Sequence, residues 1–402
     1  MKVRGHIRDL LAFRGLVPRR KQRIASAPAL ARDTDPMNEL AQCLHPRQQH
    51  MTVAAVTDET ATTKTFRLVA DAQSGTRELS YFRPGQYLSL KVDVGGVGIT
   101  RPYSISSAPA QALGPDGFYE ITVRRKPDGF LTTSMWANWQ VGTTVRSSGP
   151  CGFFYHDPLR DSGRIVGLAG GSGITPFRSM ARAIVQGDMD AQLLLLQGSS
   201  DENDIVFDRE LSELAREAPD LLRVVHVLSC ENPSKPDCER GFLTADLIRQ
   251  YAGHGDNSFF VCGPPAMYEF VERQLAVLGV PRRRIRREVF GESQDVTRLA
   301  GYPAEAADKT FRLTVHVGET TVQAPARATE TVLVALERAR VVPPSECRSG
   351  ECGFCRTRVV AGEVYVREEG DGRRAADRRF GYIHPCASYP LTDLEVTIAR
   401  ST

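Results

Sequence analysis

Four cysteines near the C-terminal end constrain the fold of this chain more than any other feature. Cys347, Cys352 and Cys355 follow the spacing C-x4-C-x2-C, and 30 residues separate Cys355 from Cys386. A plant-type 2Fe-2S cluster is held by four thiolates at this spacing, because its iron prefers soft sulfur ligands. The sequence therefore predicts a 2Fe-2S cluster on these cysteines, and a fold that returns Cys386 to the other three.

Two glycines in this segment, Gly350 and Gly353, give the backbone freedom to curl around inorganic sulfur. A zinc site is one alternative, but structural zinc usually takes paired C-x2-C knuckles, and only Cys352 and Cys355 form such a pair. Disulfides are a second alternative. The scattered placement of the other five cysteines and the expected lack of a secretory signal disfavour them.

The composition is that of a globular protein with several domains. Hydrophobic residues make up 41% and charged residues 25% of the 402 residues, enough for about two to four domains with apolar cores. No apolar run approaches the roughly 18 residues that span a bilayer. We therefore expect a soluble, cytoplasmic protein whose nine cysteines stay reduced or serve as ligands.

The excess of positive charge is confined to residues 1–50, which we predict to be a basic N-terminal extension. This stretch carries ten Lys or Arg against four Asp or Glu, so the rest of the chain sums to about −3 although the whole carries +3. A helix with weak membrane-surface contact or a partner-docking arm fits such a segment, and so does a solvated appendage. Few aromatic residues stand among the positive charges, so we expect no nucleic-acid partner.

Three different sequence patterns follow the extension. Residues 51–157 hold short alternating runs rich in Val, Thr, Tyr and Phe, which predict an antiparallel β-barrel or sandwich. Residues 158–291 alternate apolar strands with amphipathic helices, which predicts an α/β domain with a doubly wound parallel sheet. A linker is expected over 292–308, and residues 309–402 read as a hairpin, a helix and the cysteine loop.

The Arg-Pro-Tyr-Ser segment over 101–104 suits a flavin. A flavin needs a flat aromatic wall, a hydrogen-bond donor near N5, and both a cation and a helix N-terminus for its phosphates. Tyr103, Ser104 and Arg101 provide the first three. Thr132 and Thr133, expected just before a short helix, provide the fourth. Ordinary surface residues of a barrel are the alternative.

A glycine-rich turn over 167–176 joins the first strand of the predicted parallel sheet to its first helix. Gly170, Gly171 and Gly173 let a nucleotide approach the backbone closely. Thr175 suits the N-cap, so the helix dipole faces a dinucleotide phosphate. The turn lacks the strict G-x-G-x-x-G pattern, and a glycine-rich turn without a ligand is the alternative.

A Phe-Val-Cys-Gly-Pro-Pro segment over 260–265 ends a late strand, where ligands of wound sheets bind. Gly263 leaves room for a planar nicotinamide, and Cys262 places a small soft side chain beside its reactive carbon. Phe290, at the end of the domain, would cover a flavin ring until the nicotinamide arrives. A structural buried cysteine and a core phenylalanine are the alternatives.

These motifs together resemble the ferredoxin-NADP reductase superfamily, specifically its NAD(P)H:acceptor reductases with a plant-type 2Fe-2S ferredoxin domain fused at the C-terminus. The four segments occur in family order, and the resemblance covers residues 51–402. It implies a multidomain fold: an FAD-binding antiparallel β-barrel over 51–157, an NAD(P)-binding domain over 158–291, and an α+β β-grasp ferredoxin domain over 309–402.

The resemblance also implies roles for single residues. Ser104, Cys262 and Phe290 would be catalytic. The cofactor-binding residues would be Arg101, Pro102, Tyr103, Ser104, Val123, Gly129, Thr132, Thr133, Gly170, Gly171, Gly173, Thr175, Gly263 and Pro264. The metal ligands would be Cys347, Cys352, Cys355 and Cys386.

The implied function is an oxidoreductase that moves electrons from NADH through FAD and the 2Fe-2S cluster singly to a partner redox protein. FMN is less favoured than FAD. Residues 198–202, Gly-Ser-Ser-Asp-Glu, lack the arginine expected to pair with a 2′-phosphate, which favours NADH over NADPH. A redox-sensing regulatory protein and a self-contained flavoenzyme acting on an organic substrate are the alternatives.

Overall fold

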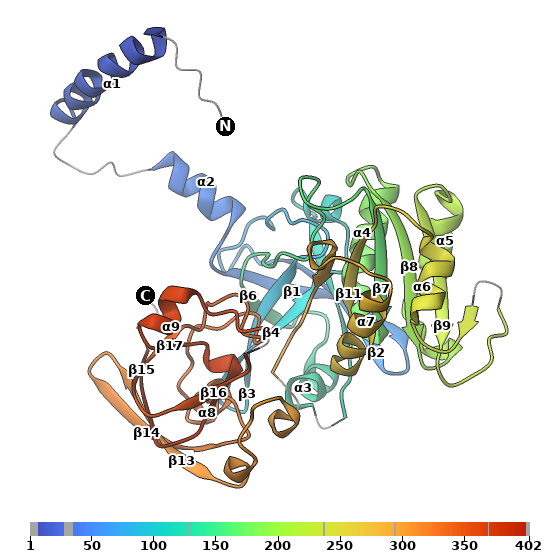
Figure 1. The fold of residues 1–402 in the computed structure, drawn as a ribbon. Coiled ribbons are helices and arrows are strands. Elements are labelled where there is room, and N and C mark those ends of the chain that lie inside the picture. The colour runs from blue at the N-terminus through green and yellow to red at the C-terminus, as the bar shows by residue number, and fades with distance from the viewer. Residues whose placement is uncertain are drawn as a thin grey trace. The chain divides into compact units, whose positions relative to one another are not determined.

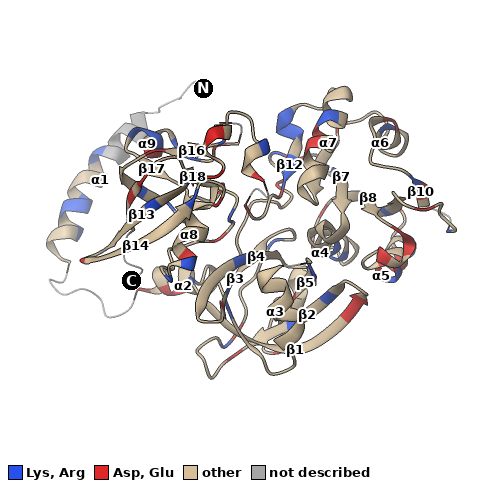
Figure 2. Cartoon of the chain, turned by 90° about the horizontal axis from the view of Figure 1, so that it is seen from below, with Lys and Arg blue, Asp and Glu red and all other residues tan. Residues whose placement is uncertain are grey.

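The computed structural model describes residues 7–27, 35–127, 129–235, 238–292, 295–368 and 370–398 (Figure 1). The chain forms two compact units, Met1–Leu44 and His45–Thr402. The first contains α1 (Ile7–Ala25) and α2 (Pro36–Leu44), and basic residues are visible along α1 in Figure 2. No helix in the described stretches is long and apolar enough to cross a membrane. The outermost residues of the predicted extension and ferredoxin domain, 1–6 and 399–402, lie outside the description.

The second unit begins with an antiparallel barrel. Of the two folds predicted for residues 51–157, a barrel or a sandwich, the structure therefore has the barrel. Its strands are β1 (Gln49–Thr60), β2 (Thr63–Ala70), β3 (Tyr87–Val94), β4 (Val97–Ser104), β5 (Phe118–Arg124) and β6 (Thr144–Ser147), in the order β4-β3-β6-β1-β2-β5. A bridge joins Ile121 of the edge strand β5 to Ile105, which directly follows the other edge strand, β4, and so closes the sheet. Alternate residues such as Met51 and Val53 point inward to form the core, on which α3 (Phe130–Asn138) packs.

A parallel α/β domain follows, as predicted. Its strands are β7 (Arg164–Gly170), β8 (Gln192–Ser199), β9 (Leu222–Leu228), β10 (Cys238–Arg240), β11 (Ser258–Cys262) and β12 (Ile285–Arg287), in the order β10-β9-β8-β7-β11-β12. Its helices are α4 (Thr175–Val185), α5 (Asp208–Glu217), α6 (Ala245–Ala252) and α7 (Pro265–Val277).

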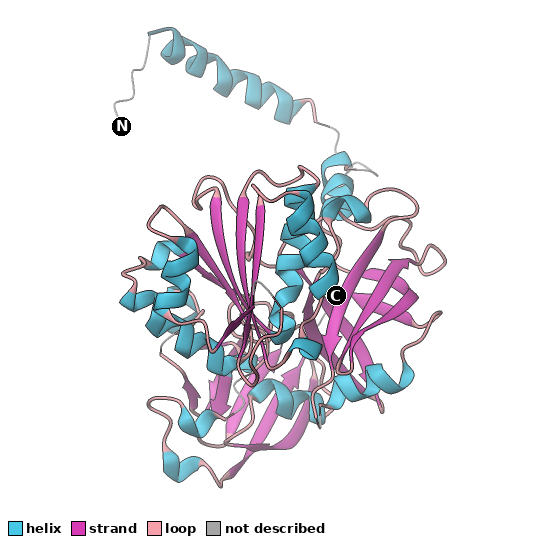
Figure 3. Cartoon of the chain, turned by 90° about the vertical axis from the view of Figure 1, so that its right-hand side faces the viewer, coloured by secondary structure: helices cyan, strands magenta, loops and turns pink. Residues whose placement is uncertain are grey.

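The helices of this domain lie on both sides of its sheet (Figure 3). One apolar cluster gathers residues of α4 and α5, and another gathers residues of α6 and α7. The strand order reverses between β7 and β11. Ligands of wound sheets bind at the carboxyl ends of strands at such a point, so the fold directs attention to the turns that follow β7 and β11.

The C-terminal part is a mixed sheet of the β-grasp type. Its strands are β13 (Thr310–Val317), β14 (Thr320–Arg327), β15 (Thr357–Ala361), β17 (Tyr382–Ile383) and β19 (Leu394–Ile398), in the order β14-β13-β19-β15-β17. A separate pair consists of β16 (Val364–Val366) and β18 (Ser388–Pro390). The predicted hairpin is β13–β14, and the predicted helix is α8 (Val332–Arg338), which packs on the sheet. A short helix, α9 (Ala375–Arg379), precedes β17.

Candidate active site

A cavity of about 720 Å³ lies between the barrel and the carboxyl ends of the parallel strands. Its volume is within the range of ligand pockets. It brings together most of the residues predicted for flavin and nucleotide: Pro102, Tyr103, Ser104, Val123, Gly170, Gly171, Gly173, Thr175, Cys262, Gly263, Pro264 and Phe290. Three motifs that are far apart in the sequence therefore share one cavity.

A buried acid lies on the barrel side of this cavity. The Oγ of Ser104, at the end of β4, donates a 2.8 Å hydrogen bond to Oε2 of Glu288. Burial raises the pKa of Glu288 well above its ordinary value, and the bond from Ser104 opposes this only in part. A carboxyl that keeps its proton in a cleft can supply a proton to a bound group. The sequence analysis missed Glu288, and its only signal was its place two residues before Phe290.

Two strand-end turns pack against each other on the nucleotide side. A Cβ at Gly173 would lie 2.2 Å from the carbonyl oxygen of Cys262, so only glycine permits this approach. The glycine thus serves the packing of the two turns as well as access for a ligand. The predicted N-cap role of Thr175 is wrong, because Ile174 holds that position and Thr175 is the first residue of α4. The Thr175 hydroxyl instead donates to the carbonyl oxygen of Ser172 at 3.1 Å.

Aromatic rings and a thiol form the apolar wall of the cavity. The rings of Tyr87 and Phe290 meet edge to face, with centroids 5.1 Å apart. Phe290 and Tyr103 both line the cavity. Burial raises the pKa of the Cys262 thiol well above its ordinary value. Cys262 is therefore a small neutral contact rather than a nucleophilic thiolate.

Four predicted flavin residues do not line this cavity. They are Arg101, Gly129, Thr132 and Thr133. Arg101 Nη1 lies 3.9 Å from Oε2 of Glu337, in the ferredoxin domain. The helix expected to follow Thr133 begins earlier, at Phe130, because Gly129 takes the N-cap position. Thr132 and Thr133 therefore lie in its first turn, where the Thr132 hydroxyl accepts a 3.2 Å bond from the amide of Lys126.

A cation at the cavity escaped the sequence analysis. Arg124 ends β5 and pairs with Asp204, which follows β8, and both line the cavity. Arg124 also stands against the glycine-rich turn, because a Cβ at Gly171 would lie 2.7 Å from its Nη1. The only signal in the sequence was its place next to Val123.

The four cysteines of the predicted cluster come together. The sulfurs of Cys355 and Cys386 are 3.4 Å apart, and the thiols of Cys352 and Cys386 lie near enough to that of Cys347 to lower its pKa. Among the described residues, no group of three or more His, Cys, Asp or Glu side chains is arranged to hold a single metal ion. Each iron of a 2Fe-2S cluster takes two protein sulfurs, so four sulfurs close together fit a cluster better than the zinc alternative.

The backbone around these cysteines also fits a cluster. The amides of Ser349 and Cys352 point to the sulfur of Cys347 at 3.5 and 3.4 Å. Gly350 has φ +85°, the left-handed conformation that lets the loop curl. The buried hydroxyl of Ser349 has no partner among the described residues, and it is a donor available to a cluster sulfur. Hydrogen bonds to sulfur stabilise reduced clusters, so this loop suits one-electron chemistry.

The cluster loop touches the edge of the cavity. The amide of Gly291, next to Phe290, donates to the carbonyl oxygen of Cys347 at 3.4 Å. Beside this contact the guanidinium of Arg348 is 1% exposed and lies between Glu292 and Glu337. A flavin against Phe290 and a cluster on Cys347 would therefore be neighbours.

Three families match the chain in order. Residues 50–156 match the oxidoreductase FAD-binding domain, residues 168–273 the oxidoreductase NAD-binding domain, and residues 315–391 the 2Fe-2S iron-sulfur cluster binding domain. The ferredoxin reductase component of 3-ketosteroid-9-alpha-monooxygenase from Rhodococcus rhodochrous is 32% identical over 351 residues, which are 85% of this chain and 94% of that protein. This chain belongs to the ferredoxin-NADP reductase superfamily.

Other proteins resemble this chain over similar lengths. The glycine betaine monooxygenase reductase subunit from Chromohalobacter salexigens is 28% identical over 85% of this chain and 93% of its own length. The solved structure of phthalate dioxygenase reductase shares the fold, with a TM-score of 0.62 and 22% identity over 91% of this chain and all of that one. The predicted cofactors, FAD, NAD(P)H and a 2Fe-2S cluster, are confirmed, and so is the predicted reductase that passes electrons to a partner redox protein.

Proposed function

We propose that this reductase takes its electrons from NADH in preference to NADPH and delivers them to the oxygenase component of a monooxygenase or dioxygenase system. The names of two relatives support an oxygenase component as the acceptor, since the proteins from Rhodococcus rhodochrous and Chromohalobacter salexigens are named as reductase parts of monooxygenases. The observation that carries the relay is the contact of Gly291 with Cys347, which places the cluster loop at the edge of the flavin cavity.

Bound FAD would accept a hydride and release its electrons one at a time. Tyr103 and Phe290 would hold its ring between aromatic side chains. The Ser104 hydroxyl, which donates to Glu288 in this structure, would hold the edge of the flavin near N5, and the carboxyl of Glu288 would keep that hydroxyl in place. Cys262 and Gly263 would border the nicotinamide, and water would be excluded by the apolar wall that these residues share with Met267.

The phosphate groups of the two cofactors would be held near the N-terminal ends of two helices, α4 and α3. Thr175 begins α4, and Gly170, Gly171 and Gly173 lie just before it, where the positive end of the helix suits a pyridine-nucleotide phosphate. Pro102, Val123, Gly263 and Pro264 would contact the two cofactors through their cavity-facing atoms. For the flavin phosphates we propose Arg101, Gly129, Thr132 and Thr133, since the last two lie in the first turn of α3.

The domain limits that we propose are 51–157 for flavin, 158–291 for nucleotide, 292–308 for the linker and 309–402 for the cluster. A cytoplasmic location agrees with cluster ligands that must stay reduced. Residues 1–50 would form a basic extension, with weak membrane-surface contact as its candidate role, since α1 exposes Leu16 and Val17 near Arg19 and Arg20.

Rapid anaerobic mixing with NADH and with NADPH tests the proposal. We expect NADH to bleach the flavin band faster at equal concentration, and the sulfur-to-iron band to bleach after it. Cytochrome c then serves as a one-electron acceptor in place of the oxygenase component. Equal rates with the two nucleotides would contradict the NADH preference, and a cluster that stays oxidised would contradict the relay.

A further inference from the structure

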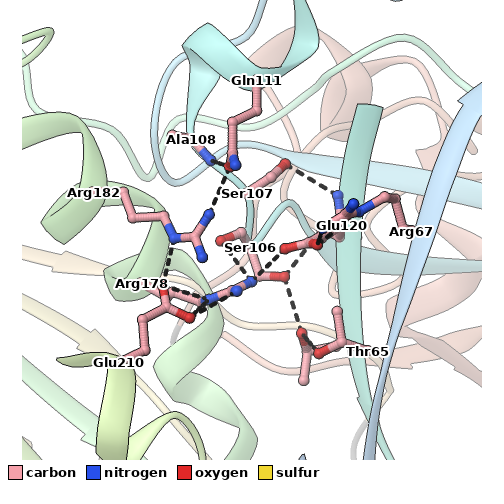
Figure 4. Close-up of polar contacts among 11 residues, drawn as sticks. Thr65, Arg67, Ser106, Ser107, Ala108, Gln111, Glu120, Arg178, Arg182 and Glu210 are labelled. Carbon is pink, nitrogen blue, oxygen red and sulfur yellow. Dashed lines mark hydrogen bonds and ion pairs between the residues drawn. The ribbon is translucent and has the colours of Figure 1, made fainter. Parts of the chain in front are cut away.

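A buried ion network connects the barrel to the nucleotide domain, outside the cavity (Figure 4). Its centre is Arg178 on α4, which is 5% exposed. Arg178 Nη1 donates to Oε2 of Glu120, on β5 of the barrel, at 2.7 Å. Arg178 Nε donates to both carboxylate oxygens of Glu210, on α5, at 2.9 and 3.1 Å. One guanidinium therefore bridges a carboxylate from each domain.

Arg178 is also tied to the two segments that line the cavity. It lies three residues after Thr175, in the first turn of the helix that follows the glycine-rich turn. Its Nη1 reaches the carbonyl oxygen of Ser106 at 3.4 Å, two residues after Ser104. The amide of Ser106 in turn donates to the carbonyl oxygen of Glu120 at 2.7 Å. Arg178 thus links the flavin motif to the nucleotide turn, in addition to the contact of Arg124 with Gly171.

Other members of the network keep its charges in place. Arg182, one turn further along α4, pairs with Glu210 and donates to the Gln111 side chain of the barrel at 2.8 Å. Burial acts to raise the pKa of Glu210, but its bonds from Arg182 and Arg178 outweigh burial, and the pKa is lowered. Arg67, on β2, donates to Oε1 of Glu120 at 2.9 Å, entirely within the barrel. Glu120 therefore has one arginine partner from each domain.

Hydride transfer depends on a precise distance between the dihydronicotinamide and the flavin. The C–H bond of the dihydronicotinamide breaks and an N–H bond forms on the flavin, which takes both electrons, and the reacting atoms must approach to about 3–3.5 Å. A displacement of about 1 Å lowers such rates by roughly 100-fold. The flavin motif and the nucleotide turn sit on separate sheets, so the contacts between the two domains must set this distance.

We propose that Arg178 is a positioning residue for hydride transfer, which sets the nucleotide turn against the flavin motif through Glu120, Ser106 and Glu210. The proposal rests on the roles proposed above for these two motifs. Arg178 touches neither cofactor site directly, and it acts by fixing the two domains that contain them. A lysine there keeps the charge but cannot bridge both carboxylates, because it lacks the planar fork of arginine.

The test compares Arg178→Lys with Arg67→Lys, which makes the same change at the other partner of Glu120. We expect Arg178→Lys to slow the reduction of the flavin by saturating NADH at least about 10-fold, with the NADH concentration for half-maximal rate changed less than about three-fold. Electron flow from photoreduced flavin to the cluster, which needs no nucleotide, should keep its rate. Arg67→Lys should keep both rates.

A second readout does not depend on activity. Amide hydrogen exchange in the first turn of α4 and at Ser106 should become faster in Arg178→Lys than in Arg67→Lys. Unchanged flavin reduction by NADH in folded Arg178→Lys would overturn the proposal, and so would an equal slowing of both electron-transfer steps. If Arg178→Lys does not fold, Glu120→Gln takes its place in the same measurements. This change weakens the ion pair with Arg178 and keeps the shape of the side chain. Wild-type protein that NADH does not reduce would count against the proposed function instead.

Discussion

The amide nitrogen of Gly291 lies 3.4 Å from the carbonyl oxygen of Cys347. Gly291 directly follows Phe290, which lines the cavity, and Cys347 is the first of the four clustered cysteines. The contact joins the end of the nucleotide domain to the cluster loop without a long intervening segment. Electrons that leave a flavin at Phe290 therefore have a short route to the cluster, and the predictions below test the parts of that route.

Removing one cluster ligand should stop the exit of single electrons. We expect Cys352→Ser to lose iron and sulfide but keep its flavin, because the barrel residues are untouched. NADH should still bleach the flavin, while reduction of cytochrome c falls at least about 10-fold. The control is Cys230→Ser, an exposed cysteine outside the cluster loop, which should behave as wild type. Undiminished cytochrome c reduction without iron would contradict the role of the cluster.

Glu288→Gln should change how stability depends on pH. Because burial raises the folded pKa of Glu288, the folded state holds a proton that the unfolded state releases near its ordinary pKa of about 4.5. The stabilising proton is fully present below that pH, and its contribution is lost as pH rises toward the folded pKa. We expect wild-type stability to fall over this window and Glu288→Gln to show a smaller fall.

Urea unfolding at a series of pH values above 4.5 measures this effect. Glu319→Gln, the same change at an exposed site of the ferredoxin domain, is the control and should keep the wild-type profile. Parallel pH profiles for wild type and Glu288→Gln would show that the carboxyl is not held neutral.

Flavin reduction by NADH should also slow in Ser104→Ala, which removes the donor to Glu288.

Nucleotide choice should respond to Glu202. Its carboxylate accepts bonds from the amide and hydroxyl of Ser234 at 2.6 and 2.8 Å, which lower its pKa and keep it charged beside Ser200 in the cavity wall. A fixed negative charge repels a 2′-phosphate. We expect Glu202→Gln to raise kcat/KM for NADPH about 3-fold to 10-fold and to leave that for NADH nearly unchanged. Glu217→Gln, on the exposed face of α5, should change neither.

The buried arginine of the cluster loop should be important for stability. Arg348 is paired with the half-buried Glu292 and the buried Glu337, so Arg348→Ala leaves both carboxylates without their nearest cation. The expected loss is about 3–5 kcal/mol. Unfolding of the ferredoxin domain, followed by the circular dichroism of the cluster, measures it. The exposed pair of Arg312 and Asp393 is the matched control, and Arg312→Ala should cost about 1 kcal/mol or less.

Features carried by short contiguous segments could be predicted from the sequence. The strand-helix alternation and the glycine-rich turn each depend on neighbours in the chain, and the structure has both where the sequence predicts them. The spacing of the cysteines also predicts that Cys386 returns to the other three, as it does here. Element ends were less predictable. α3 starts four residues and α4 one residue earlier than expected, because Gly129 and Ile174 take the N-cap positions.

Long-range pairs could not be predicted. Burial raises the pKa of Glu288 only in the folded chain, where its hydrogen-bond partner is Ser104, 184 residues away. Arg178 and Glu120 meet across two domains, and nothing near either residue in the sequence indicates the partner. The same holds for Arg124 and Asp204. Such residues have ordinary local patterns, and their chemistry appears only when separate sheets are packed together.

An anaerobic titration with NADH tests the central claim most directly. The relay predicts that about 1.5 NADH per chain bleach both the flavin band and the broad sulfur-to-iron band, since the flavin takes two electrons and the cluster takes one. Bleaching of the flavin alone, with the sulfur-to-iron band unchanged at excess NADH, would contradict it.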